Sequence, residues 1–350
     1  MRVLVQNFIG ETRAVALGTD DVPLELFIWR DRKIDPASRC GDRLNAILRH
    51  IDKGQGLAFL ELQTGEEAVF NLATGRTPPE VGARMVVQVR AEAQGDKLAI
   101  VKPVEAEVLL PSGITAFDDW IGNLGIATSS VETISLSEEN ELDAAFETAF
   151  ASSVTLSGGG VLRIDRTRAL TAVDVDTTGR DRNKSGLSVN EAAVVDLANQ
   201  IRLRRLSGLI VLDLAGAPKG QKAQNLRDLM LGELQTADIR GAKVLAPSAL
   251  GLMELSLKRT VRPLLEFDPM QCGPQRRKLE IFAEFLRAFE RAAVNHRTST
   301  CKATISMEMK HILDGQTFDW MAELSRKYGS RFDLDIEVSQ TNPFEIRAVE

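Results

Sequence analysis

Two short apolar runs near the centre of the chain, each with an aspartate as its second-last residue, constrain the fold more than any other feature of the sequence. The run "ALTAVDV" (169–175) predicts a strand whose end carries Asp174 and, just beyond it, Asp176. The run "GLIVLDL" (208–214) is almost continuously apolar, which is typical of a strand buried on both faces, and it ends near Asp213.

The segments around these two runs alternate between strand and helix patterns. Ser188 and Glu191 form an S-x-x-E capping box, which predicts a helix from Ser188 to about Leu206. "GVLRI" (160–164) and "AKVLAP" (242–247) predict further strands, and residues 221–235 predict a second helix. This order predicts a mixed or parallel sheet with crossover helices, as in α/β domains.

The predicted topology brings three carboxylates to one edge of that sheet. Asp174 and Asp176 are two residues apart, so they share one face of their strand. A right-handed crossover places Asp213 at the same edge, where ligands bind in open α/β sheets. Converging carboxylates favour a hard cation such as Mg²⁺, which takes one or two carboxylates plus phosphate oxygens. A DxD pair at a strand end also occurs as turn or cap chemistry, so this alternative stays open.

The charge distribution points to a polyanionic partner of the same region. Residues 160–262 hold 17 Lys or Arg and 11 Asp or Glu, a net charge of +6, whereas the remainder holds 26 basic and 38 acidic residues, a net charge of −12. A basic block inside an acidic protein is typical of a nucleic-acid site, although chance clustering on solvated faces is the alternative. The bases that we expect to hold phosphates are Arg180, Arg182, Lys184, Arg202, Arg204 and Arg205.

The first third of the chain is rich in short strand patterns. Residues 2–8, 12–18 and 23–29 predict three strands, and five more follow between 36 and 104. Five short strands in about 70 residues favour a small barrel of the OB type. On such a barrel Phe59 and Phe70 could stack on bases, with Lys97 near a phosphate; the alternative is that both rings are core residues.

The remaining segments are less regular. Residues 105–140 show no sustained period and predict a linker or a loosely structured insert, followed by a helix near 142–150. Residues 278–295 predict an amphipathic helix, and "KATISMEM", "FDLDIEVS" and "PFEIRAV" predict strands around a helix at 317–328. We therefore expect an α/β and β multidomain chain with these parts: N-terminal strands (1–35), an OB-type RNA-binding barrel (36–104), a linker and helix (105–150), an α/β catalytic domain (151–266), and a linker with a small α+β domain (267–350).

Cysteine usage and hydropathy exclude several classes of protein. Cys40, Cys272 and Cys301 are far apart and no CxxC is present, so neither a zinc site of the usual spacing nor a disulfide framework is expected. The start of the chain lacks the pattern of a secretory leader, and no apolar run is long enough to span a membrane. We expect a cytoplasmic protein that does not bind membranes.

Three motifs in order resemble the catalytic domain of the ribonuclease E/G family. They are "LSGGGVLRIDRTRALTAVDVDTTG", "NQIRLRRLSGLIVLDL" and "GLMELSLKRTVRPLL". They are similar to the family's runs GG-x-I-x-I-x-x-T-x-A-L-x-x-I-D-x-N, Q-x-R-L-R-x-L-x-G-L-I-V-I-D-F and G-L-x-E-x-[ST]-[RK]-[KQ]-R. Weaker similarity covers the first strands, the barrel and the C-terminal small domain.

The resemblance implies a magnesium-dependent endoribonuclease that cuts single-stranded RNA. It implies that Asp174 and Asp213 bind the metal and that Asp176, where the family has Asn, assists catalysis. The resemblance also marks four residues as RNA contacts: Phe59, Phe70, Lys97 and Asn190. Of these, Phe70 matches only with one residue inserted, and Asn190 matches a family asparagine.

The chain also departs from the family that it resembles. Only about 45 residues occupy the place of the family's insert that senses the RNA 5′ end, and "EFDPMQCGPQRR" has only Cys272 where the family has its zinc-link pair. We therefore expect Mg²⁺ but no zinc, and a homodimer, if formed, without the zinc link. The alternative functions are a catalytically weakened RNA-binding or RNA-processing accessory protein and an assembly protein that docks through its basic face.

Overall fold

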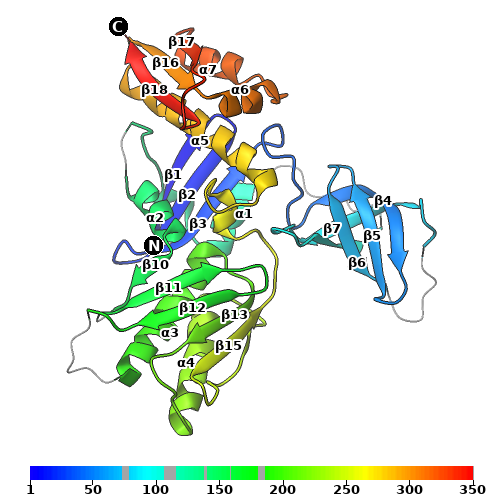
Figure 1. Cartoon of the computed structure of the whole chain (residues 1–350), viewed down its shortest axis with the longest axis vertical. Helices are drawn as coiled ribbons and strands as arrows, with labels where there is room; N and C mark the ends of the chain where they lie inside the picture. The colour runs from blue at the N-terminus through cyan, green and yellow to red at the C-terminus, as the bar shows by residue number, and fades with distance from the viewer. Residues whose placement is uncertain (73–78, 106–115, 138–139, 158, 180–185, 350) are drawn as a thin grey trace. The chain divides into compact units, whose positions relative to one another are not determined.

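The chain folds into two compact units, each assembled from segments that are distant in the sequence. Figure 1 labels the helices and strands and colours them from blue at the N-terminus to red at the C-terminus. The computed structural model describes residues 1–72, 79–105, 116–137, 140–157, 159–179 and 186–349. Unit 1 comprises Met1–Ala37, Leu110–Glu147 and Leu265–Glu350. Unit 2 comprises Ser38–Leu109 and Thr148–Leu264.

Unit 1 contains a four-stranded sheet in the order β3-β2-β1-β9. The strands β1, β2 and β3 are antiparallel, and β9 pairs in parallel with β1. The helix α1 contributes Trp120 and Ile121 to the core of this sheet, where the Trp120 ring stacks on Phe27 at 5.1 Å between centroids. The elements are β1 (Arg2–Phe8), β2 (Glu11–Leu17), β3 (Pro23–Arg30), α1 (Ala116–Leu124), a 3₁₀ turn (Thr128–Ser130), β9 (Val131–Thr133) and α2 (Glu141–Phe150), whose last turn extends into unit 2.

The rest of unit 1 is a second sheet with the order β17-β16-β18, packed against helices. Aromatic side chains of the long helix α5, Phe285 and Phe289, are fully buried in this core beside Trp320 of α7. The elements are a 3₁₀ turn (Leu264–Phe267, which begins at the last residue of unit 2), α5 (Pro274–Asn295), β16 (Thr300–Ile305), α6 (Met307–Asp314), α7 (Trp320–Tyr328), β17 (Phe332–Ile336) and β18 (Phe344–Val349).

Unit 2 begins with a closed five-stranded barrel in the order β4-β5-β6-β8-β7. Alternate residues of each strand point inward and form its core, as in small barrels. All five strands predicted between residues 36 and 104 are present, and they close into a barrel as predicted. They are β4 (Arg43–Asp52), β5 (Leu57–Leu62), β6 (Glu67–Asn71), β7 (Arg84–Ala91) and β8 (Ala99–Pro103).

The second part of unit 2 is a six-stranded mixed sheet in the order β10-β11-β12-β13-β15-β14. The pair β12 and β13 is parallel and is bridged by the crossover helix α3; the other pairs are antiparallel. The elements are β10 (Ser153–Thr155), β11 (Val161–Arg166), β12 (Thr171–Asp176), α3 (Gly186–Arg204), β13 (Gly208–Asp213), α4 (Gln221–Thr236), β14 (Lys243–Val244) and β15 (Leu252–Leu257).

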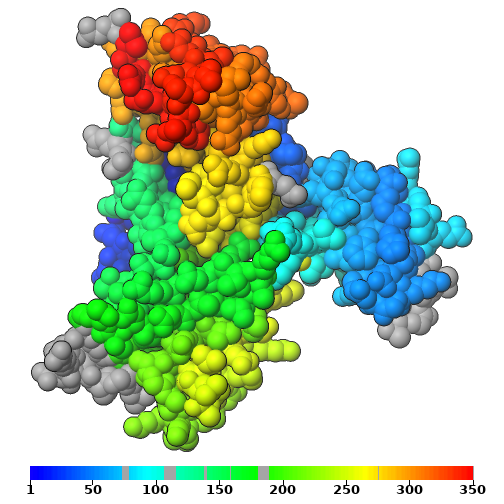
Figure 2. Space-filling view, in the orientation of Figure 1, coloured from blue at the N-terminus to red at the C-terminus, as the bar shows by residue number. Residues whose placement is uncertain are grey.

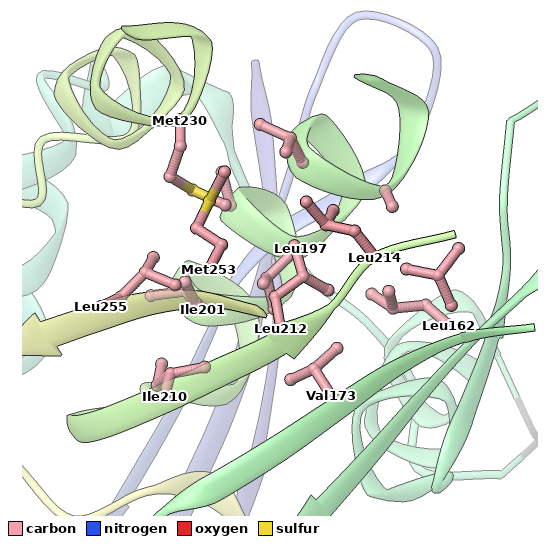
Figure 3. Packing of buried hydrophobic residues seen from close by; sticks show 14 of the residues in the cluster. Leu162, Val173, Leu197, Ile201, Ile210, Leu212, Leu214, Met230, Met253 and Leu255 are labelled. Carbon is pink, nitrogen blue, oxygen red and sulfur yellow. The ribbon is translucent and has the colours of Figure 1, made fainter. Parts of the chain in front are cut away.

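One face of this sheet packs against α3 and α4. Figure 3 shows Leu197 and Ile201 of α3 and Met230 of α4 packed against Leu212 of β13 and Met253 of β15. Because strand residues alternate between faces, burying these side chains directs their neighbours, including both strand-end aspartates, to the opposite face. Packing against α3 and α4 therefore decides where the polar residues point.

The structure corrects four predictions of secondary structure. The segment 105–140, predicted as a linker, contains α1, a 3₁₀ turn and β9 among its described residues. Helix α3 begins at Gly186, so Ser188 lies inside the helix and is not its cap. The strand predicted through Met309 ends at Ile305, because Ser306 caps α6 by accepting a hydrogen bond from the Met309 backbone N–H.

The fourth correction concerns the sheet order. The strand β15 was not predicted, and it lies between β13 and β14, antiparallel to both. The central sheet is consequently mixed, with a single parallel pair among its described ladders. Within the part of the chain that the structure describes, no helix is both long and apolar enough to cross a membrane.

Candidate metal and RNA site

Asp174 and Asp213 lie directly beside each other on neighbouring parallel strands. The register of β12 and β13 pairs Thr171 with Ile210 and, three residues later, Asp174 with Asp213. Neighbouring strands are about 4.8 Å apart, and both side chains are exposed on the face away from α3 and α4. The sequence prediction that the topology brings these two carboxylates together is therefore confirmed.

The adjacent strands bring further charged groups to the same face. Arg163 of β11 is the cross-strand partner of Asp174 on its other side, so Arg163, Asp174 and Asp213 form one row across three strands. Glu254 of β15 is exposed and pairs with Val211, one step further from the strand end. We call the row of Arg163, Asp174 and Asp213 the acidic row; it presents two carboxylates and one guanidinium.

Asp176 lies beside the acidic row but is engaged by other residues. Its Oδ1 accepts hydrogen bonds from the Thr178 hydroxyl (2.6 Å) and the Thr178 backbone N–H (2.8 Å), and its Oδ2 accepts one from Arg163 Nη2 (3.0 Å). The hydrogen bonds from Thr178, together with the one from Arg163, lower the pKa of Asp176 to about 2. Asp176 is therefore ionised at neutral pH, with both oxygens already accepting hydrogen bonds.

Asn190 holds the loop that follows Asp213. Its Oδ1 accepts a hydrogen bond from the Ala215 backbone N–H (2.9 Å), and its Nδ2 donates to the Ala215 carbonyl (3.2 Å). The same loop is packed tightly at Gly216, because a Cβ on Gly251 would lie 2.6 Å from the Gly216 carbonyl oxygen. Asn190 is only 2% exposed, so the predicted RNA contact is wrong for this residue, which instead positions the chain next to Asp213.

The prediction that Arg204 contacts RNA is also wrong. Its side chain is fully buried, and it donates to Gln200 Oε1 (2.6 Å) and to the backbone carbonyls of Ala151 (2.6 Å) and Thr148 (3.2 Å). Burial lowers the pKa of Arg204 to about 10. Arg204 therefore joins α3 to the end of α2 and has no surface left for RNA. The predicted contacts Arg180, Arg182 and Lys184 lie outside the described residues (grey in Figures 1 and 2).

The predicted barrel contacts divide between its two faces. Phe59 is half-buried on the outer face, 5.9 Å from the His50 ring, in a cross-strand row that continues through Val69. Phe70 points inward, is 8% exposed and belongs to the barrel core, so its predicted stacking on RNA bases is wrong.

The same cross-strand row ends at an exposed apolar residue. Val69 of β6 pairs with Ile100 of β8, which is 38% exposed. Lys97 is also exposed, at the turn before β8 where its backbone bonds to that of Gln94. The outer face of the barrel thus presents rings and aliphatic groups, and the exposed Lys97 lies at the turn that leads into β8.

The acidic row supplies only two carboxylates. This suits Mg²⁺ better than a metal ion whose ligands all come from protein side chains. In the described ranges, no group of three or more His, Cys, Asp or Glu residues could hold a metal ion. Asp174 and Asp213 form no ion pair with any described residue, so both carboxylates can bind a cation. Mg²⁺ binds through one or two carboxylates and completes its shell with water and phosphate oxygens, which this pair permits.

Sequence reasoning missed Arg163, the guanidinium of the acidic row. The signal that could have found it is the hairpin between β11 and β12, whose turn is closed by Thr167 and Leu170. A turn of this length sets the register, and the register places residue 163 opposite residue 174.

Comparisons with known proteins match the segment that carries this site. The model of the Ribonuclease E/G family matches residues 123–260, which include β12, α3 and β13. The chain is 30% identical over 192 residues to Ribonuclease E of Escherichia coli, covering 51% of this chain and 18% of that protein. It is 30% identical over 186 residues to Ribonuclease G of Escherichia coli, covering 51% of this chain and 36% of that protein.

A plant relative matches the same chain over a shorter stretch. The Ribonuclease E/G-like protein of Arabidopsis thaliana chloroplasts is 33% identical over 144 residues, which is 38% of this chain and 14% of the relative. The chain thus spans well under half the length of each of these relatives. The segment that matches the Ribonuclease E/G family model, residues 123–260, has the aspartate pair at its centre.

Proposed function

We propose that this protein is a cytoplasmic endoribonuclease that cleaves single-stranded RNA with Mg²⁺ held by Asp174 and Asp213. The observation that carries the proposal is the pairing of these residues on one exposed sheet face, inside the segment that matches the ribonuclease family. RNA processing by the relatives named ribonuclease E and ribonuclease G supports the substrate class.

Each part of the site has a role in this proposal. A bound Mg²⁺ would supply Lewis-acid activation of water and of the phosphodiester. Asp174 and Asp213 would hold the ion, and both project from rigid strands, so their separation does not depend on a loop. Asn190 would keep the backbone after Asp213 in place through its two hydrogen bonds to Ala215.

The barrel would bind the RNA strand. Phe59 lies on the outer face, where a base can stack on its ring, and Lys97 is exposed at the turn before β8. Stacking on aromatic rings needs unpaired bases, which supports single-stranded rather than duplex RNA as the substrate.

The test is cleavage of an end-labelled single-stranded RNA by the purified chain in Mg²⁺ or EDTA. We expect cleavage in Mg²⁺ only, and its loss in D174N and in D213N. The matched control is D238N, since Asp238 is an exposed carboxylate paired with Arg240 at the turn before β14. An excess of unlabelled duplex RNA should inhibit less than the same single strand.

Two other results would contradict the proposal. Cleavage that persists in both variants would mean that another site is responsible. RNA binding without cleavage, equal in the wild type and in D174N, would favour an RNA-binding accessory protein instead.

A further inference from the structure

Arg163 is the only described cation in the acidic row, and it turns away from the carboxylate directly opposite to it. Its backbone pairs with Asp174, yet its Nη2 donates to Asp176 Oδ2 at 3.0 Å. The guanidinium is thereby held one step along the strand, and Asp174 has no ion pair among the described residues.

Asp176 is suited to hold this guanidinium rather than a metal ion. Its Oδ1 accepts two hydrogen bonds from Thr178, and its Oδ2 accepts the one from Arg163. A metal ligand at this position would have to break at least one of these hydrogen bonds. The three groups therefore form a chain in which Thr178 orients Asp176 and Asp176 orients Arg163.

Arg163 retains donors for a ligand. Its side chain is 55% exposed, and the guanidinium has five N–H donors, of which the contact with Asp176 engages one nitrogen. Arginine is well suited to phosphate because its planar fork can donate two parallel hydrogen bonds. Without Arg163, the three carboxylates Asp174, Asp176 and Asp213 would repel an approaching RNA backbone.

We infer that Arg163, positioned by Asp176, is an RNA-phosphate-binding residue of the acidic row, and that Asp176 is a positioning residue rather than a third metal ligand. The inference rests on the proposed function, and it names the group that receives the phosphate next to the metal-binding pair. It also gives a physical role to Asp176, which stands where the family that this chain resembles has asparagine.

The direct test is RNA affinity without cleavage. A fluorescein-labelled single-stranded RNA is titrated with protein in EDTA at several salt concentrations, and binding is followed by fluorescence anisotropy. We expect R163A to weaken binding about fivefold and to reduce the slope of log K against log salt by about 0.7, as for one lost phosphate contact on a single strand. R163K keeps the charge but not the fork, so it should keep the slope and recover part of the affinity.

The matched control is R240A. Arg240 is an exposed arginine that is also paired with an aspartate, at the opposite edge of the sheet because α4 returns the chain there. R240A should leave the affinity and the salt slope unchanged. R163A binding RNA like the wild type, with the same slope, would identify an ordinary surface ion pair and overturn the inference.

The positioning role of Asp176 is tested by a double-mutant cycle. Removing a carboxylate reduces repulsion of RNA in any background, but only with Arg163 present does it also release the guanidinium. The effect of D176N on RNA affinity should therefore differ at least about threefold between the wild-type and R163A backgrounds. Equal effects in both backgrounds would overturn the positioning role.

The metal-ligand alternative has its own readout. Mn²⁺ binding to the RNA-free protein, followed by electron paramagnetic resonance, should be about as tight in R163A/D176N as in the wild type, because one cation and one anion are removed together. A loss of tenfold or more would show that Asp176 is a ligand. A wild-type chain that binds no RNA at all would contradict the proposed function itself, which separates the two failures.

Discussion

Arg30 and Glu280 form a bidentate ion pair inside unit 1 that joins the edge strand β3 to the long helix α5. The Arg30 Nη1 and Nη2 atoms donate to the two carboxylate oxygens of Glu280 at 2.8 and 2.7 Å. Both side chains are almost completely buried, and Arg276 adds a third hydrogen bond to Glu280 at 2.9 Å. Charges removed from water in this way contribute stability only while every partner is present.

Replacing Glu280 should therefore destabilise unit 1 strongly. We expect E280A to lower the free energy of unfolding by about 3–5 kcal/mol, because it leaves the Arg30 guanidinium buried without its main counter-charge. Urea denaturation followed by circular dichroism measures the change. The control is E284A, an exposed glutamate one helical turn later, which should change stability by less than about 0.5 kcal/mol. Similar losses in both variants would contradict the role of the buried pair.

The stability of unit 1 should also depend on pH through Glu11. Burial alone raises the pKa of Glu11, but the charges of Arg287, Arg30 and Arg13 outweigh it and lower the pKa to about 2. Because the folded pKa lies below the unfolded value of about 4.3, this contribution is present above pH 4.3 and is lost as the pH falls toward 2.

The measurement is the difference in melting temperature between the wild type and E11Q at several pH values. The wild type should be more stable above pH 5, and the difference should shrink steadily between pH 4.5 and the lowest pH at which both proteins fold. A difference that stays constant over this range would mean that Glu11 does not titrate on unfolding.

Asn190 offers a test of the loop that follows Asp213. We expect N190A to cost about 1–2 kcal/mol of stability, since it leaves the partly buried N–H and carbonyl of Ala215 without their partner. Cleavage and Mn²⁺ affinity should both fall, because the backbone beside Asp213 is no longer held. The control is N225A, an exposed asparagine of α4. Full metal affinity in N190A would show that the loop needs no such support.

Replacing Phe59 should affect RNA binding, whereas replacing Phe70 should affect the stability of the barrel. F59A should weaken RNA binding by about 1–3 kcal/mol, the usual value for one base stacked on a ring, with little effect on stability. F70A should instead destabilise the barrel by about 3–5 kcal/mol, because its ring lies in the core. Anisotropy titrations and thermal melts on both variants separate the two effects. Equal RNA affinity in F59A and the wild type would remove Phe59 from the RNA surface.

Local patterns in the sequence were sufficient for most elements and for the aspartate pair. "TAVDVD" and "GLIVLD" are strands in the structure, and the intervening helix makes them parallel neighbours, so the pairing of Asp174 with Asp213 follows from the sequence. The reason is that strand period and crossover handedness are local rules that hold without knowledge of the remaining chain.

Tertiary structure alone decided which polar and aromatic side chains are buried. Arg204 looks like a surface base in the sequence, but its guanidinium caps the carbonyls of Thr148 and Ala151, over 50 residues away. Phe59 and Phe70 are equally apolar, and only the barrel register places one outside and the other inside. Helix α1 is too short to show a helical period in the sequence. It is stabilised by the contact of Trp120 with Phe27.

The acidic row shows the same division within one site. Its two paired aspartates, Asp174 and Asp213, were determined by the local pattern of each strand, whereas the guanidinium beside them came from the pairing of β11 with β12. Arg163 contacts Asp176 and not Asp174. This choice depends on side-chain geometry across the strands and on Thr178, which orients Asp176. The sequence by itself determined where the acids lie, and the tertiary structure decided which of them accepts hydrogen bonds from Arg163 and Thr178, because hydrogen bonds between strands are made only after the sheet has formed.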